Sequence, residues 1–132
     1  MKYLLDTDTC IHVFRGNSAV IERMKQVSGD DLAISSITFY ELVYGAKRCA
    51  REREELRKIQ VFTQHIHQLA FGPQTALHAA GIRRVLEERG EGIGPMDTLI
   101  AATAMESKLI LVTGNQKEFS PVPGLCCESW DF

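Results

Sequence analysis

Short apolar segments alternate with longer amphipathic segments along this chain, and that alternation limits the folds available to it. Residues 2–6 (KYLLD), 32–36 (LAISS) and 109–113 (LILVT) are apolar runs of strand length. Strands joined through helices pair in parallel, and helices cover both faces of such a sheet. We therefore predict an α/β fold with a mainly parallel central sheet flanked by helices.

The segments between these runs have the periodicity of helices that pack on one face. Residues 68–71 indicate one more brief strand, and a short apolar run lies at 125–127. Gly90 is expected to end one helix, and Pro95 to begin the next. The predicted helices cover residues 7–14, 18–28, 37–48, 48–60, 74–88 and a segment starting at residue 95.

The size and composition of the chain indicate one compact domain. A chain of 132 residues, 45% hydrophobic and 24% charged, can bury a substantial core. We expect a single domain over residues 1–132. No apolar stretch approaches the ~18 residues that cross a bilayer, and the start MKYLLDTDTC lacks the apolar run of a secretion signal. The expectation is a cytoplasmic protein without membrane association.

The net charge restricts how the protein could bind nucleic acid. A formal charge of −2 argues against non-specific coating of DNA or RNA, which depends on many Lys and Arg contacts to phosphate. A nuclease remains compatible with this charge, because a divalent cation held by carboxylates reverses the local sign that the substrate meets.

Polar residues follow the predicted strands at the edge where an open parallel sheet binds its ligands. Asp6 ends the first strand and Asn115 follows the strand at 109–113. Glu41 and Asp97 lie in the opening turns of two predicted helices. If the strands are neighbours, these four side chains converge. Clustered carboxylates raise one another's pKa unless a cation neutralises them, and Mg²⁺ prefers such oxygen ligands.

This cluster predicts the metal-assisted hydrolysis of a phosphodiester bond. We expect Asp6 and Asp97 to bind the metal directly and Glu41 to complete the acid cluster and orient water. The expected supporting hydrogen bonds come from Thr7, Thr113 and Asn115.

Two of the acids also have a structural interpretation. Thr38 and Glu41 have the spacing of a capping box, so Glu41 could simply cap a helix. Thr7 or Asp8 could cap the helix at 7–14. Whether Asp8 caps that helix or joins the metal ligands stays open, and the cap is favoured.

Four segments together resemble a known family. LLDTDTCI at 4–11, ISSITFYELVYGA at 34–46, GPMDTLIAATA at 94–104 and LVTGNQKEF at 111–119 resemble, in order, the four conserved blocks of PIN domains. More narrowly they resemble the toxins of bacterial VapBC toxin–antitoxin systems. The closing PGLCCESW is also similar to the tail of that subgroup.

The resemblance implies an endoribonuclease that depends on Mg²⁺ or Mn²⁺. The first three acids of the family correspond to Asp6, Glu41 and Asp97. The fourth position, often Asp, is Asn115 here, and Glu118 is a candidate to replace the missing charge. In a second departure, Asp8 stands where related toxins commonly have Asn.

The resemblance also implies partners. The expected substrate is transfer RNA, with the anticodon stem-loop of the initiator as the leading candidate. A small VapB-type antitoxin is expected in a groove formed by the early helices, where Phe14, Tyr40 or Tyr44 would anchor it. An antitoxin arginine at the acidic rim would exclude metal and substrate. Homodimers and toxin–antitoxin hetero-oligomers are the expected assemblies.

Two other functions fit parts of the sequence. A PIN-like module that binds RNA or protein without cutting is favoured only by Asn115. A phosphotransferase in which Asp6 attacks phosphorus would need a lysine just beyond a later strand, and LILVTGN offers none before Lys117. No P-loop motif is present, which argues against nucleotide-dependent chemistry.

Overall fold

A five-stranded sheet forms the centre of the molecule in the computed structural model, which describes residues 1–130. The strand order is β3-β2-β1-β4-β5, and every neighbouring pair is parallel. The prediction of an α/β fold with a mainly parallel sheet is therefore confirmed. The strands are β1 (Tyr3–Leu5), β2 (Leu32–Ser35), β3 (His67–Leu69), β4 (Ile110–Val112) and β5 (Cys127–Glu128).

Helices connect the strands close to the predicted positions. They are α1 (Thr7–Phe14), α2 (Ser18–Lys25), α3 (Ser36–Lys47), α4 (Glu52–Thr63), α5 (Pro73–Glu88), α6 (Pro95–Glu106) and α7 (Gln116–Phe119), with a 3₁₀ turn at Gly29–Asp31. Among residues 1–130, no helix is both long and apolar enough to span a bilayer.

Some helix boundaries differ from the sequence prediction for local reasons. The helix predicted over 18–28 ends at Lys25, because Ser28 caps the 3₁₀ turn that follows. The charged segment 48–60 is helical only from Glu52, after a turn over residues 48–51. The short helix α7 was not predicted.

The end of α5 follows the sequence signal closely. Gly90 adopts φ +67°, a left-handed conformation that glycine reaches without a Cβ penalty. Its N–H donates to the Glu87 carbonyl at 3.1 Å, and the Glu91 N–H donates to the Leu86 carbonyl at 2.9 Å. The chain is thereby turned out of α5 toward α6.

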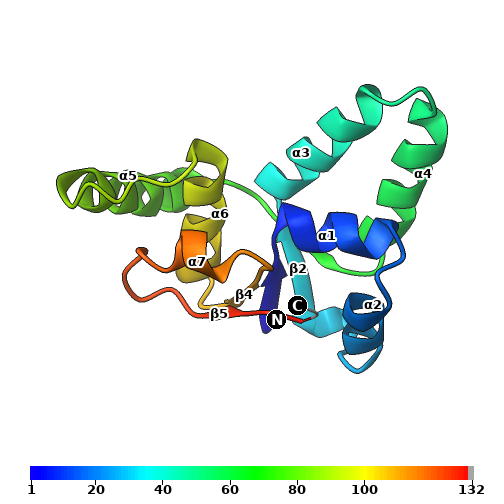
Figure 1. Cartoon of the computed structure of the whole chain (residues 1–132), viewed down its shortest axis with the longest axis horizontal. Coiled ribbons are helices and arrows are strands. Elements are labelled where there is room, and N and C mark those ends of the chain that lie inside the picture. The colour runs from blue at the N-terminus through cyan, green and yellow to red at the C-terminus, as the bar shows by residue number, and fades with distance from the viewer. Residues whose placement is uncertain (131–132) are drawn as a thin grey trace.

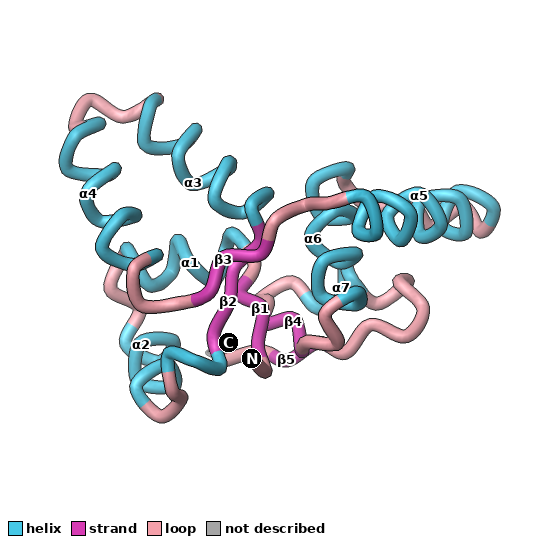
Figure 2. The backbone as a smooth tube through the Cα atoms, turned by 180° about the vertical axis from the view of Figure 1, so that it is seen from behind, coloured by secondary structure: helices cyan, strands magenta, loops and turns pink. Residues whose placement is uncertain are grey.

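Two helical layers enclose the sheet (Figures 1 and 2). The helices α1, α2, α3 and α4 lie on one side, and α5, α6 and α7 on the other. A hydrophobic cluster lies on each face of the sheet, and successive side chains of β1 point to opposite faces. Leu4 packs in the cluster with α5 and α6, whereas Tyr3 and Leu5 pack in the cluster with α1 to α4. Strands buried on both faces explain why the strand segments read as continuous apolar runs.

The strand order reverses between β1 and β4. From β1 the chain builds β2 and β3 on one side, then crosses through α5 and α6 to build β4 and β5 on the other. Open α/β sheets bind ligands beyond the carboxyl ends of their strands at this kind of switch point. Asp6 follows β1 directly and Thr113 follows β4 directly, so both lie at the switch.

Candidate active site

Asp6 links the end of β1 to the start of α1. Its backbone is extended, at φ −76° and ψ 173°, and its Oδ1 accepts the Thr9 N–H at 2.8 Å. Asp6 is therefore the N-cap of α1, and the prediction that Thr7 or Asp8 caps this helix is wrong. The reason is that α1 begins immediately after the strand. Asp8 is exposed in the first turn, and its negative charge contributes to raising the pKa of Asp6.

The Asp6 carboxylate is buried, with 4% of the residue exposed. Burial raises its pKa, while hydrogen bonds from Thr113 and Thr9 partly oppose that rise. Thr113 is fully buried, and its Oγ1 also accepts the Asn115 N–H at 3.0 Å. Thr113 thus ties the end of β4 to Asp6.

Glu41 lies in the second turn of α3, not in its opening turn. Ser35 caps this helix, because its Oγ accepts the Thr38 N–H at 3.0 Å. The capping-box interpretation of Glu41 is therefore wrong. Instead, Glu41 Oε1 accepts the Thr7 hydroxyl at 2.5 Å, and Thr7 Oγ1 lies 3.2 Å from Thr38 Oγ1. These contacts leave Glu41 at the same edge of the sheet as Asp6.

Asp97 is the acid whose electrostatic surroundings connect the whole cluster. It is in the first turn of α6, which begins at Pro95 as predicted. Its pKa is raised to about 7, first by burial, then by a hydrogen bond with Glu118 and by the negative charges of Glu118, Glu41 and Asp6. The fold thus brings four carboxylates from distant parts of the sequence into one electrostatic environment.

Glu118 lies beside both Asn115 and Asp97. Asn115 is exposed, and its Nδ2 donates to Glu118 Oε2 at 2.5 Å. A Cβ placed on Gly94 would lie 3.5 Å from Asp97 Oδ2 and 3.9 Å from Glu118 Oε1, so both carboxylates flank Gly94. The sequence indicates this contact through the spacing of three residues between Asn115 and Glu118. In the structure this spacing corresponds to about one turn at the start of α7.

The donors at this edge suit a hard divalent cation. Among the described residues, no three Asp, Glu, His or Cys side chains are close enough to hold a metal ion by themselves. Mg²⁺ typically uses only one or two protein carboxylates and completes its shell with water and substrate phosphate. Burial, the hydrogen bond with Glu118 and the repulsion between the carboxylates all raise the pKa of Asp97, and a cation would relieve the repulsion. The residues present therefore fit Mg²⁺ or Mn²⁺.

A groove of about 390 Å³ runs between α1, α3 and α4 and reaches the acid cluster at Glu41. Phe14 lines it, together with Arg15 and Lys58. Tyr40 and Tyr44 are not among the lining residues, and each is 55% exposed. The structure thus separates Phe14 from the other two aromatic residues that the sequence placed at one partner surface.

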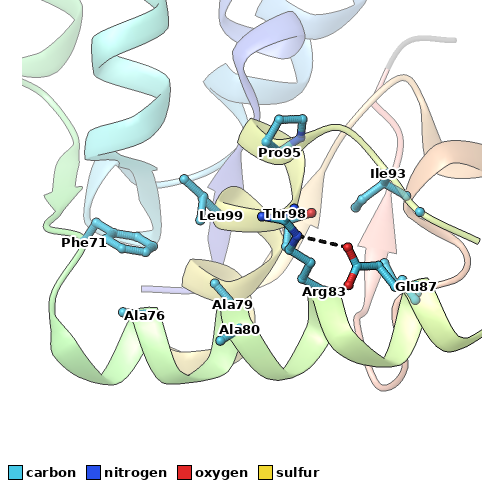
Figure 3. A pocket seen from close by; sticks show the side chains of 12 residues that line it. Phe71, Ala76, Ala79, Ala80, Arg83, Glu87, Ile93, Pro95, Thr98 and Leu99 are labelled. Carbon is cyan, nitrogen blue, oxygen red and sulfur yellow. Dashed lines mark hydrogen bonds and ion pairs between the residues drawn. The ribbon is translucent and has the colours of Figure 1, made fainter.

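A larger cavity, of about 560 Å³, lies between α5 and α6 (Figure 3). Its walls are mainly apolar and include Phe71 and Leu99, and an ion pair between Arg83 and Glu87 at 3.3 Å lies on the α5 side. None of the four acids lines this cavity. It is therefore separate from the candidate active site.

Comparison with known proteins agrees with this geometry. A family model described as PIN domain matches residues 3–125. The tRNA(fMet)-specific endonuclease VapC of Salmonella typhimurium is 34% identical over 130 residues, 98% of each chain. The protein of the same name from Shigella flexneri is 35% identical over 130 residues, with the same coverage. The solved structure of DNA-bound VapBC from Salmonella typhimurium contains a chain that matches with a TM-score of 0.94 at 34% identity, covering 98% of both chains.

Proposed function

Because this chain belongs to the PIN-domain family, we propose that it is an endoribonuclease and the toxin component of a type II toxin–antitoxin system. The relatives that match it along nearly their whole length are named as ribonucleases and tRNA endonucleases. The observation that carries the proposal is the convergence of three carboxylates, Asp6, Glu41 and Glu118, on that of Asp97 at the switch point of the sheet. An acid cluster at that place suits metal-assisted hydrolysis of a phosphodiester bond.

We assign the roles of the acids from their correspondence with the acids of PIN domains, and the roles of the supporting residues from the contacts that they make. Asp6 and Asp97 are the direct ligands for Mg²⁺ or Mn²⁺, and Glu41 orients the attacking water. When bound, the ion lowers the pKa of water and stabilises charge that develops on the phosphate. Glu118 completes the cluster, and Asn115 orients it through the hydrogen bond at 2.5 Å. Thr7 and Thr113 hold Glu41 and Asp6 in place.

The proposed substrate is transfer RNA. The relatives from Salmonella typhimurium and Shigella flexneri carry names that specify tRNA(fMet). The PIN-domain match over residues 3–125 includes every element that positions the acids. Initiator transfer RNA is therefore the first substrate to test, with its anticodon stem-loop as the expected place of cleavage.

The proposed regulator is a VapB-type antitoxin bound in the groove between α1, α3 and α4. Phe14 offers an aromatic contact inside this groove, which also contacts Glu41. A cationic antitoxin side chain paired with Glu41 would compete with the metal and with the substrate phosphate at once. Solved relatives are VapBC complexes, and we propose a homodimer within a toxin–antitoxin hetero-oligomer for this chain as well.

The two alternative functions have lost their grounds. The non-catalytic module rested on Asn115, but Glu118 now provides a carboxylate beside Asp97. The phosphotransferase would need a lysine just beyond a later strand, where the chain has none before Lys117, and the relatives are named as ribonucleases and endonucleases.

Cleavage of bulk transfer RNA by the purified protein tests the proposal, with Mg²⁺ or Mn²⁺ and with both removed by a chelator. The informative variant is Asp6→Asn, because Asn caps a helix about as well as Asp but lacks the charge. Asp30→Asn, an exposed acid in the 3₁₀ turn, is the matched control. We expect metal-dependent cleavage by the wild type and the control, and on the order of 10²–10³-fold less by Asp6→Asn. An inert wild type would overturn the proposal.

A further inference from the structure

Two tyrosines and an arginine form an exposed stripe along α3. Tyr40, Tyr44 and Arg48 are spaced by four residues, so they lie on one side of the helix over about two turns. The rings of Tyr40 and Tyr44 are stacked, with centroids 6.5 Å apart and planes 16° apart. The Arg48 guanidinium lies 5.5 Å from the Tyr44 ring centroid. We call these three residues the tyrosine stripe.

No core contact accounts for the two tyrosines. The buried face of α3 consists of Thr38, Leu42 and Ala46. Tyr40 and Tyr44 belong to neither hydrophobic cluster of residues 1–130, and each residue is 55% exposed. They also lie outside the groove between α1, α3 and α4. Large apolar side chains that gather on a surface mark an interaction site more often than single ones do.

We propose that the tyrosine stripe is the surface on which unpaired bases of the RNA substrate stack, an inference that rests on the proposed ribonuclease function. Proteins recognise single-stranded RNA by stacking splayed-out bases on aromatic side chains and on arginine planes. The stripe offers both kinds of surface in one row. A double helix keeps its bases stacked inside, so the stripe selects RNA with an open loop.

The position of the stripe connects binding to cleavage. Glu41, which takes part in the acid cluster, is the residue next to Tyr40 on the same helix. Glu41 lines the groove and the stripe lies outside it, so a strand whose bases stack on the stripe has to turn around α3 to bring its phosphate to the acids. A base on Tyr40 would hold a nearby phosphate in reach of the cluster, which favours cleavage within a loop.

Charge and area favour RNA over a second copy of this chain. Arg48 makes no ion pair with a carboxylate of residues 1–130, and Lys47 beside it makes only an exposed one with Glu52 at 3.6 Å. Both cations are available to phosphate. Two half-exposed tyrosines offer on the order of 200–300 Å², well below the ~800 Å² per partner of a stable interface.

Binding of two RNAs by matched variants tests the inference. All proteins carry Asp97→Asn to prevent cleavage. One RNA is a fluorescently labelled hairpin with an unpaired loop, and the other is a fully paired duplex of the same length. The test variant is Tyr40→Leu with Tyr44→Leu, which keeps apolar bulk without rings. The control is Tyr40→Phe with Tyr44→Phe, which keeps the rings.

We expect the leucine pair to raise the Kd for the hairpin about 10- to 100-fold, as the loss of one or two stacked bases implies. The phenylalanine pair should stay within about 3-fold of its parent, and neither pair should change binding of the duplex. In proteins with Asp97 restored, the leucine pair should raise KM for the hairpin and leave kcat within about 3-fold.

Several results would overturn the inference. One is unchanged hairpin binding by the leucine pair, and another is an equal loss of hairpin and duplex binding. A third is a leucine pair that binds the hairpin with an unchanged Kd but shows a lower oligomeric state in light scattering. A leucine pair with an unchanged hairpin Kd that the co-expressed antitoxin inhibits more weakly would have the same meaning. If the wild type cleaves no RNA, the ribonuclease proposal fails, whereas these binding measurements still decide the role of the stripe.

Discussion

The helices α3 and α6 each bring one carboxylate to the same edge of the sheet, but they are built differently. α6 lies between the sheet and α5 (Figure 1) and is buried along most of its length, at Thr98, Ile100, Ala101, Ala102, Thr103 and Ala104. α3 buries only Thr38, Leu42 and Ala46, and it exposes the tyrosine stripe.

This difference separates two tasks within one site. The small residues of α6 allow close packing on two sides, which fixes Asp97 and partly removes it from water, so its pKa rises to about 7. α3 is fixed mainly from one side, and Glu41 depends on the Thr7 hydroxyl for its orientation. The embedded helix holds an acid rigidly, while the exposed helix has a surface left for binding.

The largest expected effect concerns the acid on the embedded helix. Asp97→Asn should reduce cleavage on the order of 10²–10³-fold, because it removes a proposed metal ligand. The fold should remain intact, since Asp97 caps no helix and its removal relieves repulsion. Single-turnover cleavage of transfer RNA measures the loss. Retention of more than a tenth of the wild-type rate would contradict the role of Asp97.

A leucine introduced on each of the two helices should affect stability differently. Ala101 on α6 is fully buried, so the added bulk of Ala101→Leu should lower the free energy of unfolding by ~1–3 kcal/mol. Tyr40 on α3 is exposed, so Tyr40→Leu, which removes a ring, should alter the free energy of unfolding by less than about 0.5 kcal/mol. Urea unfolding of both variants measures the two changes in the free energy of unfolding. Equal changes would contradict the difference in packing between α3 and α6.

The dependence of Glu41 on Thr7 can be tested by removing one hydroxyl. Thr7→Val keeps the shape of the side chain but loses the donor at 2.5 Å, and we expect about tenfold slower cleavage at limiting Mg²⁺. Thr7→Ser should restore the rate to within about 3-fold. A Mg²⁺ titration separates this positioning role from a structural one, because a purely structural Thr7 would leave the metal dependence unchanged.

The raised pKa of Asp97 predicts how stability depends on pH. Between the ordinary value of 3.8 and about 7, the folded protein holds a proton on Asp97 that the unfolded chain has released. The metal-free protein is therefore more stable at pH 5 than at pH 8 through this group, since stability falls as pH rises through that window.

Asp97→Asn should remove that contribution. Because the carboxylate is partly exposed, solvent screening leaves ~1 kcal/mol, or about 3–5 °C of the pH-dependent difference in Tm. Mg²⁺ should raise the Tm of the wild type more at pH 8 than at pH 5. A pH dependence identical in Asp97→Asn and wild type would show that this carboxyl titrates normally.

The smallest expected effect is a gain. Gly45 lies in the middle of α3 with nothing within 4 Å of the place where a Cβ would stand. Gly45→Ala should therefore raise the free energy of unfolding by ~0.5–1 kcal/mol through the higher helix propensity of alanine. Cleavage by the free protein should not change. A decrease in stability would mean that α3 is packed as tightly as α6.

The accuracy of the sequence prediction followed the range of the interactions involved. Apolar runs predicted β1, β2 and β4, because burial on both faces leaves no room for polar residues there. The cap of α1 was predicted wrongly, and so was the alternative interpretation of Thr38 and Glu41 as a capping box in α3. The residue that caps a helix is decided by where the chain leaves the preceding strand, and a shift of one to three residues moves the cap from Thr7 or Thr38 to Asp6 or Ser35.

By itself, the sequence determined the parallel α/β architecture and the positions of Asp6, Glu41 and Asp97 along it, since periodicity and strand ends are local properties of the chain. Only the tertiary structure decided that Glu118 joins these acids and that Tyr40 and Tyr44 stand apart from the groove at Phe14. Those outcomes depend on strand order and on the rotation of each helix about its axis. Both are set by packing between segments that are far apart in the sequence.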